Sequence, residues 1–177
     1  MKYFATIFTM TDFKVRPELI FWLLRLGLKS SQINFVAGNG RSPPVVYNLG
    51  VRKAMEQDAE RFIFADCDIS PSPLTDPVLE SQLDICSTAC NTECSNSDWD
   101  ADDFHSGLWT ARKETIREIG LPLFRWELNG DETHITKCLC LVLAEKARKL
   151  GYTVGNAGVA GHTPRHKVEQ ESFRINM

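Results

Sequence analysis

Short apolar runs alternate with helical patterns along the first third of the chain. Apolar and β-branched runs, each bounded by polar or turn-forming residues, predict strands over residues 3–10, 33–37 and 61–65. Between these runs, leucines recur at helical spacing from Leu19 to Leu26, and a second helical pattern covers residues 45–57. Strands and helices that alternate at this spacing predict βαβ units and a mainly parallel sheet.

Beyond residue 70 the pattern is less regular, because several prolines interrupt it. We expect further strands over residues 83–88, 107–111 and 152–156, and a short helix over residues 113–119. The longest helix is predicted over residues 131–150, since Ile135, Leu139 and Leu143 share one face and Gly151 follows as a C-cap. Together these elements predict an α/β fold, with a mainly parallel sheet flanked by helices.

Length and charge narrow the classes of function. A chain of 177 residues can bury one core, so we expect a single domain. The formal net charge is −3 and the isoelectric point is about 5.8, whereas nucleic-acid-binding proteins carry an excess of basic residues on one face. No apolar stretch approaches the roughly 20 residues that span a bilayer. We therefore expect a cytoplasmic protein with no membrane span and no nucleic-acid partner.

Two acidic residues, Asp66 and Asp68, follow the predicted strand over residues 61–65. In open α/β sheets, ligands bind beyond the carboxyl ends of the strands, and residues i and i+2 of an extended segment project to the same side. Two carboxylates on one side repel each other unless a cation or a proton lies between them. Mg²⁺ and Mn²⁺ prefer such hard oxygen ligands and keep positions open for phosphate. The alternative interpretation is a solvated acidic turn.

The wider pattern resembles the GT-A glycosyltransferases, especially the large family of inverting, nucleotide-sugar-dependent enzymes. Residues 48–73 read NLGVRKAMEQDAERFIFADCDISPSP, in which a helix carrying an Asn leads to an apolar strand that ends in an Asp-x-Asp motif. Residues 104–124, FHSGLWTARKETIREIGLPLF, are similar to that family's segment with a Gly, an Arg-led helix and a Gly-Leu-Pro turn. Residues 130–133, GDET, are similar to its Glu-Asp motif. The resemblance spans nearly the whole chain.

This resemblance implies a single GT-A-like domain and assigns roles to individual residues. It implies a nucleotide-binding half over residues 1–70, an acceptor and catalytic half over residues 71–154, and a mobile tail over residues 155–177. It implies that the nucleotide sugar contacts Thr9, Asp12, Asn48, Asp66 and Gly107. It also implies that Mn²⁺ or Mg²⁺ binds to Asp66, Asp68 and His162.

The implied reaction is the transfer of a sugar from a nucleoside-diphosphate donor, a UDP- or GDP-sugar, to an acceptor that the sequence leaves open. An inverting transfer needs a carboxylate that takes the proton of the acceptor hydroxyl. The resemblance gives this role to Asp131 or Glu132, whose order is reversed relative to the family motif, so both stay candidates. The short chain also leaves a homo-oligomer open.

Two other functions are compatible with the same residues. In a haloacid-dehalogenase-like phosphatase, Asp66 would be the nucleophile and Asp68 the acid, because the segment over residues 66–70 also fits the pattern Asp-x-Asp-x-Thr/Ser. That family usually places the motif on its first strand, whereas two βα units precede it here. The second alternative is a protein that binds a nucleotide sugar without catalysis.

Overall fold

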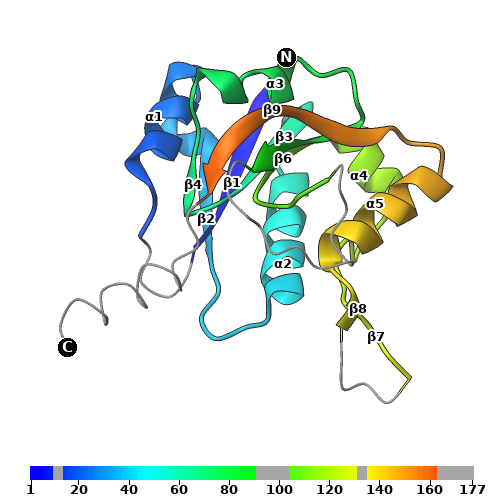
Figure 1. Ribbon diagram of the computed structural model, residues 1–177. Helices are drawn as coiled ribbons and strands as arrows, with labels where there is room; N and C mark the ends of the chain where they lie inside the picture. Colours follow the sequence, from blue (N-terminus) through cyan, green and yellow to red (C-terminus); the bar gives the residue numbers. More distant parts are fainter. Residues whose placement is uncertain (10–13, 91–103, 131–134, 163–177) are drawn as a thin grey trace.

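A computed structural model describes residues 1–9, 14–90, 104–130 and 135–162 of the chain. These residues form one α/β domain around a seven-stranded sheet in the order β2-β1-β3-β6-β5-β9-β4 (Figure 1). The strands are β1 (Tyr3–Thr9), β2 (Ile33–Ala37), β3 (Arg61–Asp66), β4 (Ile69–Ser70), β5 (Ile85–Cys90), β6 (Leu108–Arg112) and β9 (Val154–His162). Only β4 and β6 run against the other strands of this sheet. The predicted α/β fold with a mainly parallel sheet is therefore confirmed.

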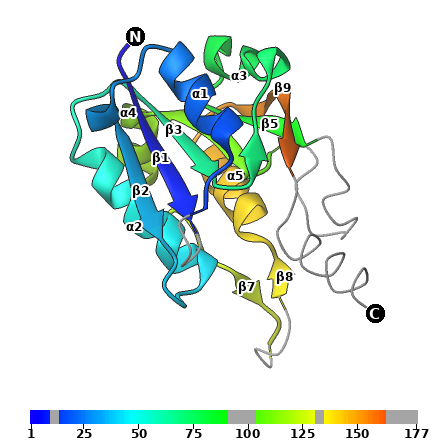
Figure 2. The ribbon, with the colours of Figure 1, turned by 90° about the vertical axis from the view of Figure 1, so that its left-hand side faces the viewer.

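Helices cover both faces of the sheet (Figures 1 and 2). They are α1 (Pro17–Arg25), α2 (Pro43–Met55), α3 (Pro77–Glu80), α4 (Lys113–Ile119) and α5 (Leu139–Lys149). Side chains of α1 and α3 pack with Ile7 and Ile63 on one face, whereas α2, α4 and α5 pack with Phe64 on the other. Because strand side chains alternate between faces, both cores draw on the same strands, which explains their continuous apolar runs. No helix in the described part of the chain has the length and apolar character that a bilayer crossing requires.

The long helix predicted over residues 131–150 is shorter in the structure. It begins after Cys138, whose Sγ caps the first turn of α5. The preceding residues form β8 (Ile135–Lys137), which pairs with β7 (Glu127–Leu128) in a hairpin that projects from the body of the domain (Figure 1). The prediction was wrong for residues 135–138, because a single apolar residue in register, Ile135, fits a strand as well as a helix.

The last strand, β9, is longer than the predicted strand over residues 152–156. It pairs in parallel with β5 and, at its end, antiparallel with β4. Its sequence is rich in glycine, which has a low β-propensity, so pairing on both sides outweighs local preference. At Gly158, φ is +75° and an added Cβ would lie 2.6 Å from the carbonyl oxygen of Leu74. The segment expected to be a tail from residue 155 is thus a sheet strand as far as His162, and residues 163–177 lie outside the described residues.

Candidate functional site

The acidic pair lies at the carboxyl end of β3, between the ends of β1 and the start of β6. The backbone N–H of Asp66 donates to the carbonyl oxygen of Gly107 over 2.7 Å, and that of Cys67 donates to Phe8 over 3.0 Å. The side chain of Cys67 is 5% exposed and belongs to the core beneath α1. This backbone pairing fixes Asp66, and through the following turn Asp68, at the sheet edge where α/β proteins bind ligands.

A cavity of about 200 Å³ lies beside these two carboxylates. The end of β1, the turn after β2 and the first turns of α2 surround it, and its lining includes Thr9, Gly38, Arg41, Val46, Tyr47, Asp66 and Asp68. The hydroxyl of Thr9 is buried and has no hydrogen-bond partner among the described residues. A buried polar group in this condition costs free energy, so a ligand that bonded to it would recover part of that cost.

Burial changes the ionisation of Asp66. Its pKa is raised from 3.8 to about 7, chiefly because the carboxyl is removed from water. A hydrogen bond from the Tyr47 hydroxyl, 2.7 Å long, opposes this change, whereas the negative charge of Asp68 adds to it. The pKa of Tyr47 is itself raised well above 10.0 by burial and by the charge of Asp66, so the hydroxyl remains a donor. A cation at this site would favour the ionised form of Asp66.

Asp68 lies beside His162, which comes from the far end of the sequence. The imidazole Nε2 is 3.4 Å from the Oδ1 of Asp68, and the two side chains are only 13% and 17% exposed. The contact follows from the sheet, because Ile69 at the start of β4 pairs with His162 at the end of β9. The structure thus places His162 against Asp68, and the charges of both residues act on the neighbouring carboxyl of Asp66.

The side chains of Asp66, Asp68 and His162 carry donor atoms that suit a divalent cation, provided that another molecule supplies further ligands. In the described ranges of the chain, no three His, Cys, Asp or Glu side chains form a group that could hold a metal ion. Mg²⁺ is usually bound by one or two carboxylates together with water and substrate phosphates, and seldom by an all-protein cage. The donor atoms of Asp66, Asp68 and His162 are therefore of types that bind Mg²⁺ or Mn²⁺, but as placed they would need oxygens of phosphate or water to complete the coordination.

Of the remaining predicted site residues, some lie near the acidic pair, one has a structural contact elsewhere, and three are outside the described residues. Thr9 lines the cavity, and Gly107 bonds to the backbone of Asp66. Asn48 lies on α2, where its amide Nδ2 donates to the carbonyl of Phe124 over 2.7 Å and its Oδ1 accepts from Leu123 over 2.8 Å. These bonds attach α2 to the turn before β7. The three other predicted residues lie outside the described residues: Asp12, Asp131 and Glu132.

The sequence did not single out Tyr47 or Arg41, and it gave a weaker case for His105 than for His162. Tyr47 precedes Asn48 on α2, and the resemblance assigned a role to Asn48 alone. Only the packing of α2 on β1 directs the Tyr47 hydroxyl to Asp66. Arg41 follows the turn at Gly38 and is an exposed residue that lines the cavity. The ring centroid of His105 lies 5.9 Å from that of His162. None of the three has a sequence spacing that would have connected it to the acidic pair.

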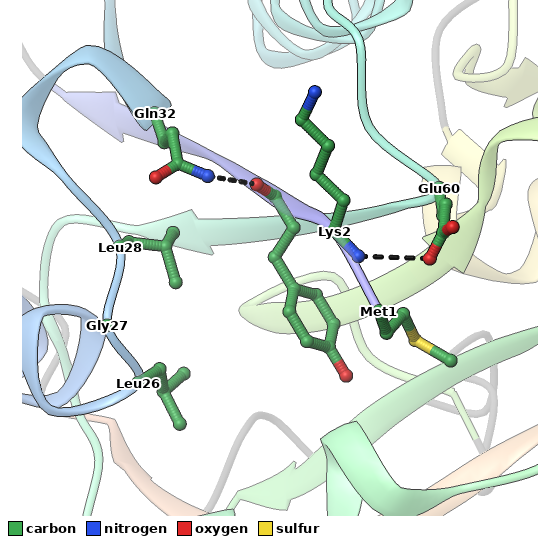
Figure 3. Close-up of a pocket in the computed structure, with 8 residues that line it drawn as sticks. Met1, Lys2, Leu26, Gly27, Leu28, Gln32 and Glu60 are labelled. Carbon is green, nitrogen blue, oxygen red and sulfur yellow. Dashed lines mark hydrogen bonds between the residues drawn. The ribbon is translucent and has the colours of Figure 1, made fainter.

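A second cavity, of about 420 Å³, lies at the opposite end of β1 (Figure 3). Its polar groups bond to one another: the backbone N–H of Lys2 donates to Glu60 over 3.0 Å, and Gln32 donates to the carbonyl of Tyr3 over 3.1 Å. These bonds connect the amino ends of β1 and β3 with the segment before β2. We therefore interpret the residues around this cavity as structural.

Comparisons with known proteins support the fold and go no further. No protein-family model matches the chain, and no curated protein matches it. Among solved structures, A197 from STIV is similar over 90% of this chain and 82% of its own, with a TM-score of 0.57 and 12% identity. The inositol-1-phosphate CTP transferase from T. maritima aligns with 92% of this chain and 70% of its own, with a TM-score of 0.45 and 12% identity. At 12% identity, the similarity to A197 shows a shared fold and nothing about function. The TM-score of 0.45 for the transferase is too low to support a conclusion. The chain is thus a single α/β domain with the fold of A197.

Proposed function

We propose that the protein is a cytoplasmic, metal-dependent glycosyltransferase that transfers a sugar from a UDP- or GDP-sugar to an acceptor, with inversion. The observation that carries this proposal is that Asp66 and Asp68 line a cavity at the carboxyl edge of the sheet, where His162 contacts Asp68. The order of motifs along the chain, similar to that of the GT-A enzymes, supports the same function. Free thiols at Cys67, Cys86, Cys138 and Cys140 agree with a reducing compartment.

In this proposal, the two parts of the nucleotide-sugar donor bind to different parts of the site. The diphosphate lies next to Asp68 and His162, and the nucleoside extends into the cavity toward Thr9 and Arg41. Without a cation, the negative charges of Asp66 and Asp68 would repel a diphosphate. The proposal therefore requires Mn²⁺ or Mg²⁺, which would be held by Asp66, Asp68 and His162.

The chemistry that such a cation supplies is the stabilisation of negative charge on the departing nucleoside diphosphate. The protein's own residues supply position and proton transfer. Tyr47 holds one oxygen of Asp66 and thereby directs the carboxylate. On the acceptor side, Asp131 or Glu132 takes the proton of the attacking hydroxyl, which raises the nucleophilicity of its oxygen.

Binding and turnover assays test this proposal together. Calorimetry of UDP and GDP binding, with Mn²⁺ and then with EDTA, should show binding only in the presence of the cation. Asp68→Asn should abolish this binding and the release of nucleoside diphosphate from a sugar nucleotide, while the melting temperature is kept or raised, because one of two crowded charges is lost. The matched control is Asp58→Asn, a carboxylate 95% exposed on the surface, which should bind as the wild type does. Equal affinity with and without the cation would refute the proposal.

The same assays separate the two alternatives. A phosphatase would release phosphate from a phosphate ester and would use Asp66 as an ionised nucleophile. The hydrogen bond from the Tyr47 hydroxyl weakens Asp66 in that role, because it occupies a lone pair of the carboxylate. A protein that only binds nucleotide sugars would show metal-dependent affinity without release of any product.

A further inference from the structure

His105 lies in the short segment that leads into β6, at the same edge of the sheet as the acidic pair. Its backbone N–H donates to the Oγ of Ser87 over 3.0 Å, and the hydroxyl of Ser87 also bonds to the side chain of Asn156 on β9. The segment before β6 is thus fixed to two neighbouring strands. The side chain of His105 is intermediate in exposure, so it is held in place without being enclosed.

The ring of His105 is positioned relative to Asp66 by a chain of two hydrogen bonds. Its Nδ1 accepts from the backbone N–H of Gly107 over 3.0 Å, and the carbonyl of Gly107 accepts from the backbone N–H of Asp66 over 2.7 Å. A Cβ at position 107 would lie 3.0 Å from this Nδ1, so a glycine suits the close approach of the ring. Because Nδ1 accepts a hydrogen bond, the proton of the neutral imidazole is on Nε2.

His105 also lies close to the residues that would hold the cation. Its ring centroid is 5.9 Å from that of His162, with the ring planes tilted by 53°, and His162 is 3.4 Å from Asp68. A diphosphate bound beside Asp68 would therefore lie within reach of a donor on His105. A neutral imidazole with a fixed N–H suits this task, because it donates a hydrogen bond to an anion without needing to be protonated.

We propose that His105 is a substrate-binding residue whose Nε2–H donates a hydrogen bond to a phosphate oxygen of the nucleoside diphosphate. This inference rests on the proposed function, because it assumes that a diphosphate binds beside Asp68. It adds a role that neither the acidic pair nor His162 supplies, namely a neutral donor to an oxygen that the cation does not neutralise. His105 takes no part in the bonds that form or break during sugar transfer, and it acts only by binding the phosphate.

Two substitutions separate this donor role from a structural one. His105→Asn keeps an acceptor near the Nδ1 position for the N–H of Gly107 but removes the donor at Nε2. His105→Gln places an amide N–H near the Nε2 position and loses the acceptor for Gly107. We expect His105→Asn to weaken the binding of UDP and GDP with Mn²⁺ by about 10-fold to 100-fold, as for the loss of a hydrogen bond to a charged group. We expect His105→Gln to weaken it by less than about 5-fold.

Calorimetry with the wild type and both variants measures these affinities, with uridine and guanosine as probes that lack phosphate. Nucleoside affinity should be equal in wild type and His105→Asn, which would locate the effect at the phosphates. Equal diphosphate affinity in the two proteins would overturn the inference and leave the proposed function standing. Loss of Mn²⁺ binding by His105→Asn without nucleotide, measured by electron paramagnetic resonance, would overturn it by making His105 a cation ligand.

A measurement on the wild type covers the case in which a variant fails to fold. Nitrogen-15 NMR of histidine-labelled protein should show His105 as the Nε2–H tautomer, and its Nε2 signal should shift when UDP or GDP is added with diamagnetic Mg²⁺. A protonated Nδ1, or an Nε2 signal that stays unchanged while the nucleotide binds, would overturn the inference. If the wild type binds neither nucleotide with a cation, the proposed function fails and the inference fails with it.

Discussion

Asp66→Asn should make the metal-free protein more stable, and the gain should grow with pH. In the folded protein the pKa of Asp66 is raised from 3.8 to about 7, so between these values the native state keeps a proton that the unfolded chain has released. Stability from such a group is fully present below the unfolded pKa and is lost as the pH rises toward the native one. Asn cannot ionise, and its amide oxygen still accepts the hydrogen bond from Tyr47.

The magnitude follows from the two pKa values. Their difference corresponds to about 4 kcal/mol of unfolding free energy once the carboxyl is ionised in both states. At pH 5 only about 1–2 kcal/mol of this loss has occurred, because the pH is little above the unfolded pKa. The difference in unfolding free energy between Asp66→Asn and the wild type should therefore increase by about 2–3 kcal/mol from pH 5 to pH 8.

Urea denaturation at pH 5, 6, 7 and 8 with EDTA, followed by circular dichroism, measures this difference. Asp84→Asn is a control, because the pKa of Asp84 is shifted in the opposite direction to that of Asp66. Burial alone would raise the pKa of Asp84, but hydrogen bonds from Thr153 outweigh it and lower the pKa. Asp84 thus stabilises the fold above the unfolded pKa, and its loss should destabilise the protein at pH 8 and less so in acid. A stability difference for Asp66→Asn that stays constant with pH, or a loss of stability at pH 8, would refute the reasoning.

Two further predictions concern packing and catalysis. Gly50→Ala should lower the unfolding free energy by about 1–3 kcal/mol in a urea titration, although alanine favours helices, because a Cβ there would overlap the buried ring of Phe8. The control Gly130→Ala, with nothing within 4 Å, should change it by less than about 0.5 kcal/mol; equal effects would contradict the packing argument. Of Asp131→Asn and Glu132→Gln, one should lower turnover by about 100-fold or more at unchanged donor affinity, and unchanged turnover in both would remove the support for an inverting transfer.

The order of strands and helices from β1 to β3 was predictable because local sequence determines it. The apolar runs of β1 and β3 are buried on both faces, so they stand out from the helices beside them without any knowledge of the fold. β2, at the edge of the sheet, is less buried but is also an apolar run. The predicted boundaries of β2 and α4 agree with the structure. The same pattern placed Asp66 and Asp68 at the end of β3, because an apolar strand that ends in two carboxylates can be recognised from the chain alone.

The errors occurred where pairing partners outweighed local preference. β8 forms because Ile135 and its neighbours have β7 to pair with, although a helical pattern could also include them. β9 continues to His162 through a glycine-rich sequence because β5 and β4 bond to it on either side. Neither partner is visible in the segment itself, so propensity and periodicity could not reveal them.

The sequence by itself determined the α/β class, the domain count and the strand-end position of the acidic pair, since each depends on short-range periodicity. Only the tertiary structure decided which residues surround that pair. Tyr47 reaches Asp66 through the packing of α2 on β1, and His162 reaches Asp68 through the pairing of β4 with β9. His105 joins them because β6 runs beside β3. These contacts connect residues far apart in the chain, and their distances follow from sheet order and helix packing, which no local pattern encodes.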